Sequence, residues 1–325
     1  MIIFDQRWIG DHGIGRFARE LFKSNIGKKC IKLNNKPTSI FDVFILTKYL
    51  CSDKNIYFTP GYNSPLLFLK RSVITVHDLN HIDVDNNSSI LKRVYYNLIL
   101  KRACRNARKI FTVSEFSKKR IIEWSGMDEE NIFVLGNGVS EVFNTLAKPH
   151  ENYRNYVLIV GNRKTHKNEE RALESFLTAD IDPNIKLIFT GNETESLKAI
   201  ILKFNASKRV HFTGNVGDKE LASLYKSANF LLFPSLYEGF GLPVIEAMAC
   251  GTAVITSNTT SLVEIAEDGA LLVNPRDITE ITKAIEFFSN KPESKDKFID
   301  RGIIISKKYS WDKIRKKFDE QMSNL

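Results

Sequence analysis

The feature that most constrains the fold is the alternation of short apolar runs with amphipathic stretches along the whole chain. Apolar runs this short, separated by segments of helical periodicity, are typical of parallel strands that helices cover on both faces. In the first part of the chain a helix is expected near residues 14–25, and the apolar runs lie at 2–5, 41–46, 72–78, 109–114 and 131–136. The alternation predicts an α/β fold of the doubly wound type.

The same pattern starts again at residue 156. The second series of apolar runs lies at 156–161, 186–191, 209–214, 230–235, 252–257 and 270–275. A chain of 325 residues is long enough for two domains that each bury a core. We therefore expect two Rossmann-like domains, residues 1–145 and 151–308. The polar segment 140–155 has neither helical nor strand periodicity and is the best candidate for the linker.

Charge is distributed unevenly between the two halves. The chain carries 47 Lys and Arg against 38 Asp and Glu, a net charge of +9, while its 43% hydrophobic content excludes a disordered protein. Residues 1–150 carry 23 basic and 14 acidic side chains, and residues 151–325 carry 24 of each. The surplus predicts an anionic partner for the first half.

Cysteine content and hydropathy suggest a compartment. Four scattered cysteines form no CxxC pair, which favours a reducing cytosol over a disulfide framework. The N-terminus reads as a strand rather than a signal peptide, and no run approaches the ~18 apolar residues of a spanning helix. We expect a cytoplasmic protein that meets a membrane only from the side.

The segment 230–258 concentrates the residues that are suited to a ligand. A buried strand is followed by a loop with Gly239 and Gly241 and then by a helix, whose N-terminus favours a phosphate group. Glu238 and Glu246 flank this turn, and carboxylates there are better suited to accept hydrogen bonds from sugar or ribose hydroxyls. The alternative is structural: Glu246 as an acid that favours the start of the helix, and Glu238 as a solvated loop residue.

The stretch YEGFGLPVIEAMACG resembles the signature of the family 4 retaining glycosyltransferases. That resemblance implies the GT-B fold, in which two Rossmann-like domains face a central cleft. It also implies an acceptor site in the first domain, a nucleotide-sugar site in the second, and a last helix, about 309–325, that returns to the first domain. Glu238 then contacts the transferred sugar and Glu246 the nucleotide ribose. The backbone at Gly239, Phe240, Gly241 and Leu242 contacts the sugar and the diphosphate.

A basic loop, VGNRKTHKN (160–168), follows the first strand of the second half. Lys167 and Arg163 are placed to neutralise a diphosphate as it leaves, although solvated loop cations are an equally ordinary interpretation. The family has a lysine equivalent to Lys167 and usually an arginine nearby. Asn162 stands where many members carry that arginine, so whether Arg163 takes its role stays open.

The segment GIGRFARELF (13–22) follows the opening strand. Its glycines alone suggest a nicotinamide dehydrogenase, but that function needs an acid after the second strand, where only Asn34 and Asn35 occur. The resemblance instead implies a glycine loop over the donor, with Gly13 and Gly15 giving room to the backbone.

His77 ends a predicted buried strand, where ligands bind in open α/β sheets. A lone histidine is more often structural. The VHDL context is similar to the active-site histidine of the family, which implies a catalytic set of His77, Glu238 and Lys167.

Two further features call for other interpretations. Asp83-Val84-Asp85 has the form of a metal-binding DxD, but it lies in a polar segment and GT-B enzymes generally need no such metal, so we read it as surface. We expect no metal and no cofactor, the nucleotide sugar being a substrate.

The region 90–120 carries ten Lys or Arg against one acid, Glu115. No nucleic-acid-binding motif accompanies these charges. Helical spacing relates the apolar residues Leu91, Val94, Tyr95, Leu98 and Ile99. A basic amphipathic helix suits an anionic membrane surface, which Lys101, Arg102 and Arg105 would contact, whereas an ordinary core-facing stripe gives the same spacing.

Together these features predict a glycosyltransferase. The segments GIGR, VHDL and GNRKTHKN together resemble those of mannosyltransferases that build bacterial surface polysaccharide. The resemblance implies transfer of a hexose, with mannose from GDP-mannose as the first choice, to a lipid-linked or saccharide acceptor in bacterial surface polysaccharide (O-antigen) synthesis. A UDP- or dTDP-sugar donor and a GT-B nucleotide-sugar epimerase are the alternatives. A basic nucleic-acid-binding protein is the least favoured.

Overall fold

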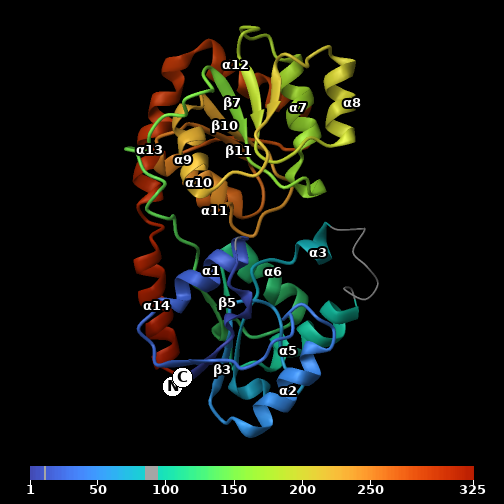
Figure 1. Ribbon diagram of the computed structural model, residues 1–325, viewed down its shortest axis with the longest axis vertical. Coiled ribbons are helices and arrows are strands. Elements are labelled where there is room, and N and C mark those ends of the chain that lie inside the picture. The colour runs from blue at the N-terminus through green and yellow to red at the C-terminus, as the bar shows by residue number, and fades with distance from the viewer. Residues whose placement is uncertain (11, 85–93) are drawn as a thin grey trace. The chain divides into compact units, whose positions relative to one another are not determined.

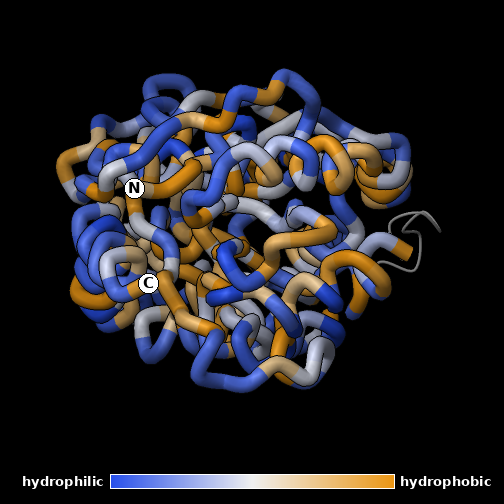
Figure 2. The backbone as a smooth tube through the Cα atoms, turned by 90° about the horizontal axis from the view of Figure 1, so that it is seen from below, coloured by the Kyte–Doolittle hydropathy of each residue, from blue (hydrophilic) through white to orange (hydrophobic). Residues whose placement is uncertain are grey.

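The computed structural model describes residues 1–10, 12–84 and 94–325, and the chain divides into two compact units (Figure 1). The first unit combines Met1–Gly138 with Trp311–Leu325, and the second is Val139–Ser310. The second unit is thus inserted in the sequence of the first, and the boundary falls before residue 145. Figure 2 shows hydrophobic and hydrophilic stretches alternating along the chain.

Each unit contains one parallel six-stranded sheet. In the first unit the strand order is β2-β1-β3-β4-β5-β6, and the strands are β1 Ile2–Phe4, β2 Lys28–Cys30, β3 Ile56–Thr59, β4 Ser72–Thr75, β5 Lys109–Thr112 and β6 Ile132–Val134. In the second unit the order is β12-β11-β10-β7-β8-β9, and the strands are β7 Tyr156–Ile159, β8 Lys186–Phe189, β9 Val210–Phe212, β10 Phe230–Phe233, β11 Val254–Ser257 and β12 Leu271–Val273. These sheets confirm the α/β doubly wound class.

Helices connect the strands. The first unit contains α1 Gly13–Phe22, α2 Asp42–Ser52, α3 Asn80–Asp83, α5 Lys101–Asn106, α6 Glu115–Ser125 and α14 Trp311–Ser323. The second contains α7 Glu169–Thr178, α8 Glu195–Lys203, α9 Asp218–Ser227, α10 Leu242–Ala249, α11 Ser261–Ala266, α12 Ile278–Asn290 and α13 Asp296–Ser306. The short 3₁₀ helices are η1 Gln6–Trp8, η2 Leu69–Arg71, η4 Glu129–Asn131, η5 Thr165–Lys167 and η6 Pro292–Lys295. The segment η3 Tyr95–Leu100 is a π-helix.

One predicted strand is wrong. The apolar run 41–46 belongs to α2, and the third strand of the chain is instead β3, which pairs with β1 and β4. The helix buries Val43, Leu46 and Leu50, which recur at helical spacing, while the apolar residues between them face outward. An apolar run on both faces of a helix has the same sequence pattern as a buried strand.

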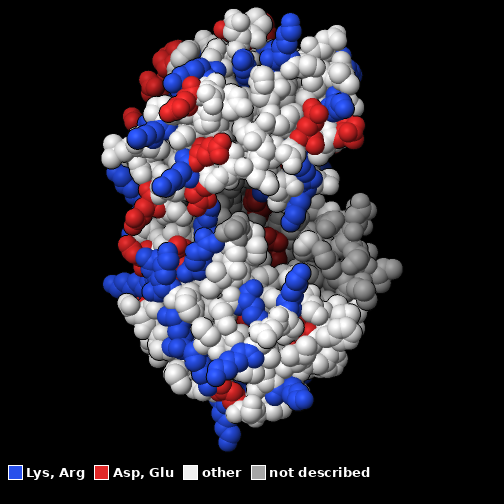
Figure 3. All heavy atoms as spheres, viewed as in Figure 1, with Lys and Arg blue, Asp and Glu red and all other residues white. Residues whose placement is uncertain are grey.

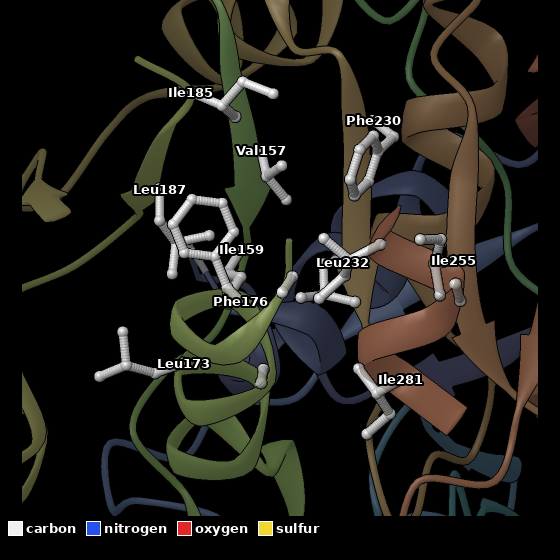
Figure 4. Close-up of a cluster of buried hydrophobic side chains, with 14 of the residues drawn as sticks. Val157, Ile159, Leu173, Phe176, Ile185, Leu187, Phe230, Leu232, Ile255 and Ile281 are labelled. Atoms are coloured by element: carbon white, nitrogen blue, oxygen red, sulfur yellow. The ribbon is translucent and has the colours of Figure 1, made fainter. Parts of the chain in front are cut away.

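Strand residues of the second unit alternate between two cores. Val157 and Ile159 of β7 pack with α7, α8 and α12 on one face (Figure 4). Tyr156 and Leu158 pack on the other face against side chains of α9, α10 and α11. Because successive side chains of a strand point to opposite faces, a continuous apolar strand needs helices on both sides of the sheet.

The last helix completes the core of the first unit. Phe318 of α14 lies against Phe58 of β3 and Phe111 of β5, with ring centroids 4.8 and 5.9 Å apart. Helix α14 also packs on α1. The side chains buried by α14 are Trp311, Ile314, Phe318 and Met322.

The segment 140–155 is not a free linker. Phe143 is buried in the core of the second unit, and Tyr153 packs against the same cluster. These two apolar side chains hold the segment against the second unit, although most of its residues are polar. In residues 1–10, 12–84 and 94–325, we find no helix with the length and apolar character needed to cross a membrane.

Candidate active site

The sheet of the second unit has a topological switch point between β7 and β10. From β7 the chain moves outward through β8 and β9, and then returns to β10 on the other side of β7. The loops that follow β7 and β10 therefore leave the carboxyl edge in opposite directions, and ligands of open α/β sheets bind in the crevice between such loops. These are residues 160–168 and 234–241, the two segments in which the sequence analysis placed the donor site.

Lys167 and Glu238 meet at this switch point. Lys167 Nζ donates to Glu238 Oε1 at 2.7 Å, and the two side chains are only 14% and 12% exposed. The ammonium also lies 5.0 Å from the centre of the Phe233 ring. The Leu236 amide donates to the carbonyl of His166 at 2.7 Å and so joins the two loops directly. One cation and one carboxylate are thus held side by side in a shielded position.

The loop between Glu238 and α10 has a fixed shape. Ser261 Oγ donates to the carbonyl oxygens of Glu238 and Phe240 at 2.8 and 3.0 Å. Gly241 has a φ of +106°, and a Cβ atom at this position would lie 2.6 Å from Leu262 Cδ2. Only glycine fits there without strain. The first amides of α10, which lack intrahelical acceptors, start immediately after this loop.

Glu246 is the fifth residue of α10 and is buried. Its Oε2 accepts a hydrogen bond from Tyr225 Oη of α9 at 3.2 Å. This position lies beyond the first turn of the helix, so the simple explanation of Glu246 as a first-turn acid does not hold. A buried carboxylate in this place needs polar partners, and Tyr225 supplies one of them.

Arg163 fastens the basic loop to its surroundings. Its guanidinium donates to Glu169 Oε1 at 2.6 Å and to the carbonyls of Thr190 and Asn192 at 2.6 and 2.7 Å. The backbone of Arg163 has a φ of +63°. Burial raises the pKa of Glu169, an effect that Arg163 opposes. In this arrangement the donors of Arg163 join the ends of β7 and β8, whereas Lys167 faces Glu238.

Asn168 and Glu169 organise the site but escaped the sequence analysis. Asn168 Nδ2 donates to the carbonyls of Pro234 and Pro275 at 2.9 and 2.7 Å, which ties together the loops after β7, β10 and β12. Its φ is +59°, a conformation that asparagine tolerates better than most residues. The sequence does carry a signal for this helix start, because Asn168 stands directly before Glu169 and Glu170, and asparagine followed by acids is typical of a helix N-terminus.

His77 follows β4 in the first unit. Its Nε2 lies 2.9 Å from the carbonyl oxygen of Pro60, and its ring packs edge-on against Phe17 at 4.8 Å. Burial lowers the pKa of His77, so the ring is neutral at neutral pH. Because a carbonyl only accepts, the proton of the neutral ring is on Nε2, and Nδ1 keeps a lone pair for a ligand hydroxyl.

The loop that carries Pro60 rests on a buried ionic network. Arg7 Nη2 lies 2.6 Å from Asp5 Oδ2, and Arg7 Nη1 lies 2.6 Å from Asp42 Oδ1. Asn63 Nδ2 donates to both carboxylates, and its Oδ1 accepts from Thr59 Oγ1 at 2.6 Å. The network lies at the ends of β1 and β3. The sequence analysis did not connect these residues, which are scattered along the chain.

Gly13 and Gly15 lie in the first turn of α1 rather than in a loop. Gly15 is buried, and a Cβ atom there would lie 2.5 Å from the carbonyl oxygen of Gly10. Nothing lies within 4 Å of the corresponding position at Gly13. His12 Nδ1 caps the helix by accepting from the Gly15 amide at 3.0 Å. The close approach of Gly10 accounts for a glycine at position 15.

Lys101, Arg102 and Arg105 lie on α5, which follows η3 and precedes β5 in the chain. Arg102 Nη1 donates to the Leu66 carbonyl at 2.7 Å, and Arg105 Nε donates to the Ser125 carbonyl. Lys101 Nζ lies 5.9 Å from the centre of the Trp124 ring. These cations therefore also support the local fold. Leu91 lies outside the described residues, and Val94 and Leu98 of the predicted apolar stripe are exposed rather than in the core.

A pocket of about 400 Å³ adjoins the basic loop. Its walls come from residues 163–165, the first turns of α7 and α8, Leu236 and Ile278. This volume falls within the range of ligand pockets. Lys167 and Glu238 do not line it, so the pocket lies beside their pair rather than around it.

Asp83 forms a surface ion pair with Arg120, whose Nη2 lies 2.7 Å from Asp83 Oδ1. Asp85, the second acid of the predicted DxD, lies outside the described residues. Within residues 1–10, 12–84 and 94–325, no group of three or more His, Cys, Asp or Glu side chains is arranged to hold a metal ion.

Comparison with known proteins places this geometry in a family. Residues 143–304 match the family described as glycosyl transferases group 1, and residues 57–142 match the one described as glycosyltransferase family 4. The O-antigen chain mannosyltransferase RfbU of Salmonella typhimurium is 32% identical over 259 residues, which cover 78% of this chain and 70% of that protein. The O-antigen chain mannosyltransferase B of Escherichia coli is 28% identical over 271 residues, with coverages of 79% and 71%.

The fold has solved counterparts as well. The Anabaena protein HepE, in complex with UDP and glucose, superposes with a TM-score of 0.76 at 17% identity, covering 100% of this chain and 99% of that one. Two Rossmann-like units with this topology define the GT-B class of glycosyltransferases. The chain belongs to glycosyltransferase family 4, which confirms the resemblance seen in the sequence.

Proposed function

We propose that this enzyme transfers mannose from GDP-mannose, with retention of anomeric configuration, to a lipid-linked or saccharide acceptor in the synthesis of a bacterial surface polysaccharide. The observation that carries the proposal is the Lys167–Glu238 pair at the switch point of the second unit. A shielded cation beside a carboxylate matches the two ends of a nucleotide sugar, the anionic diphosphate and the hydroxylated sugar. The names of the two mannosyltransferase relatives support the choice of mannose.

Donor binding replaces the ion pair by two new contacts. Lys167 turns to the diphosphate, while Glu238 accepts hydrogen bonds from the sugar hydroxyls and Glu246 from the ribose. The bond between C1 of the sugar and the diphosphate oxygen then breaks, and its electrons go to the diphosphate. The acceptor hydroxyl bonds to C1 on the face that the diphosphate leaves, and its proton passes to the departing diphosphate oxygen. Lys167 and the first amides of α10 stabilise the charge that builds up on the leaving group.

His77 is proposed to contact the transferred sugar. Its unprotonated Nδ1 is an acceptor for a sugar hydroxyl, and a neutral ring adds no charge that would compete with Lys167 for the diphosphate. The first unit, which carries His77 and the surplus of basic residues, is proposed to bind the acceptor. A lipid-linked acceptor places the enzyme at the cytoplasmic face of an anionic membrane, where the cations of α5 contribute.

Thermal stabilisation by free nucleotides tests the donor. GDP is expected to raise the melting temperature more than UDP or dTDP, and a single-stranded DNA 20-mer is expected to have no effect. Stabilisation by DNA alone would contradict the proposal, and a preference for UDP or dTDP would exclude the mannose donor. Transfer from GDP-mannose is then measured by mass spectrometry of a bacterial lipid extract, in EDTA and in Mn²⁺. Strict dependence on Mn²⁺ would contradict the role given to Lys167.

Replacing Glu246 with glutamine is expected to weaken GDP binding by about 10- to 100-fold, because a charged acceptor for the ribose hydroxyls becomes neutral. Tyr225→Phe is the matched control, since it removes the hydrogen bond to Glu246 and keeps the carboxylate. Isothermal titration with GDP compares the two variants. Equal losses of affinity in both, or wild-type affinity in Glu246→Gln, would show that Glu246 has only a structural role.

A further inference from the structure

Helix α2 of the first unit is apolar on two faces. Leu46 and Leu50 point inward and pack with Ile3 and Tyr57 in the core. On the opposite face Phe41 and Phe44 are 62% and 60% exposed, and Ile45 lies beside them. Residues at i, i+3 and i+4 share one face of a helix, so these three side chains form one outward stripe. A contiguous exposed apolar stripe is typical of an interaction surface, unlike apolar side chains that are exposed singly.

The stripe continues onto a neighbouring element. Leu67 and Leu98 are 55% and 64% exposed, and Val94 is exposed as well. The backbone of Leu66 shows that these parts are adjacent: its amide donates to Thr47 Oγ1 of α2 at 2.8 Å, and its carbonyl accepts from Arg102 of α5 at 2.7 Å. Figure 1 shows α2 and α5 close together in the first unit. We name this the apolar surface: Ile40, Phe41, Phe44, Ile45, Leu67, Val94 and Leu98.

The apolar surface is bordered by cations. Lys48 lies one turn beyond Phe44 on the exposed side of α2, and Lys101 and Arg102 follow directly on η3. The sole acid in the segments 36–52, 60–71 and 94–109 is Asp42, and it is buried in the ion pair with Arg7. On the face drawn in Figure 3, blue Lys and Arg side chains predominate over red Asp and Glu in the lower unit. Within these three described segments the border is therefore positive and carries no exposed carboxylate.

An apolar surface bordered by cations favours an anionic lipid bilayer as its partner. Exposed aromatic and aliphatic side chains beside Lys and Arg suit the interface of an anionic bilayer, where the rings enter the acyl boundary and the cations meet the headgroups. A second copy of the chain fits poorly, because a twofold dimer through this surface would bring the same cations of both copies together.

We infer that the apolar surface docks the first unit on an anionic lipid bilayer, with α2 and η3 lying flat in the headgroup region. This deepens the proposed function and rests on its lipid-linked acceptor. It also assigns the insertion to Phe41, Phe44 and Leu98, and reduces Lys101 and Arg102 to a supporting electrostatic role. Asp42, the first residue of α2, joins this helix to Arg7 and Asn63 in the ionic network. That network supports the loop that carries Pro60, whose carbonyl contacts His77.

Cosedimentation with vesicles tests the inference. The wild-type protein is expected to bind vesicles of phosphatidylcholine with 30% phosphatidylglycerol, and to bind pure phosphatidylcholine at least about tenfold more weakly. The double variant Phe41→Ser, Phe44→Ser is expected to reduce partition into the anionic vesicles by about tenfold or more. Both side chains are on the exposed face, so the fold is retained. The matched control is Leu202→Ser, because Leu202 is 59% exposed on α8 of the second unit.

Three results would overturn the inference. One is wild-type binding to the anionic vesicles that equals binding to pure phosphatidylcholine, or no binding at all. Another is a double variant that partitions like wild type or no worse than Leu202→Ser. The third is a dimer, measured by light scattering, that the double variant dissociates while vesicle binding persists. Stabilisation by GDP, measured on the same samples, separates the two proposals: if GDP stabilises a protein that ignores vesicles, the docking surface fails and the proposed function stands.

Discussion

Replacing Lys167 with methionine is expected to lower kcat for sugar transfer by about 100- to 1,000-fold, the range found when one preorganised charge or donor for a developing anion is removed. The reason is the position of the side chain. Lys167 Nζ is fixed next to Glu238 and above the Phe233 ring, in a place shielded from solvent. A cation in such surroundings acts on a leaving diphosphate more strongly than one in water, because screening is weak there.

The matched control is Lys164→Met. Lys164 is in the same loop, three residues earlier, but its side chain is exposed and is bound to no carboxylate by a described ion pair. We expect activity within about threefold of wild type for this variant, since exposed charges contribute little. Glu238 loses its partner in Lys167→Met, so the melting temperature of both variants is measured as well. Equal activity in Lys167→Met and Lys164→Met would exclude Lys167 from the reaction.

Replacing Arg7 with methionine is expected to have the largest effect on stability, a loss of about 3–5 kcal/mol from the first unit. The substitution leaves two carboxylates, Asp5 and Asp42, buried beside each other without a cation. Although burial opposes the charge of Arg7, hydrogen bonds from its guanidinium to both acids raise the pKa of Arg7 above its ordinary value. Tyr57 Oη, which donates to Asp5 Oδ2 at 2.7 Å, does not replace the lost charge.

Scanning calorimetry measures this loss. For a unit of roughly 150 residues, 3–5 kcal/mol corresponds to a melting temperature lower by about 10–15 °C. Arg301→Met is the control: Arg301 also makes a bidentate ion pair, with Asp268, but the pair lies on the surface of the second unit. We expect no measurable shift for that variant. A first-unit transition that is unchanged in Arg7→Met would mean that the network contributes nothing to stability.

Much of the fold followed from the sequence because its signal is local. The six strands of the second unit appear as apolar runs bounded by glycine or proline, and each run recurs as a strand. The failure at 41–46 is equally instructive. Phe44 and Ile45 face outward on α2, so these two apolar residues belong to the exposed surface of the helix and not to the core. The local sequence pattern cannot distinguish a buried strand from a helix with a second, exposed apolar face.

The candidate site was predictable only in part. The positions of Glu238 and Lys167 came from two motifs that lie far apart in the chain, and their contact at 2.7 Å is a property of the strand order. Asn168 donates to two carbonyls on other loops. Arg7 forms ion pairs with Asp5 and Asp42, which lie far apart in the sequence. Such contacts leave no periodicity in the sequence, because each partner is an isolated polar residue whose meaning depends on the fold.

The discontinuity of the first unit has a consequence for the order of folding. Helix α14, whose Phe318 packs between Phe58 and Phe111, is the last element of the described chain to be synthesised. Residues 139–310 are contiguous, so on the ribosome the second unit has its whole sequence available while the sheet of the first still exposes these two phenylalanines. The nascent chain therefore has the complete sequence of the second unit before that of the first.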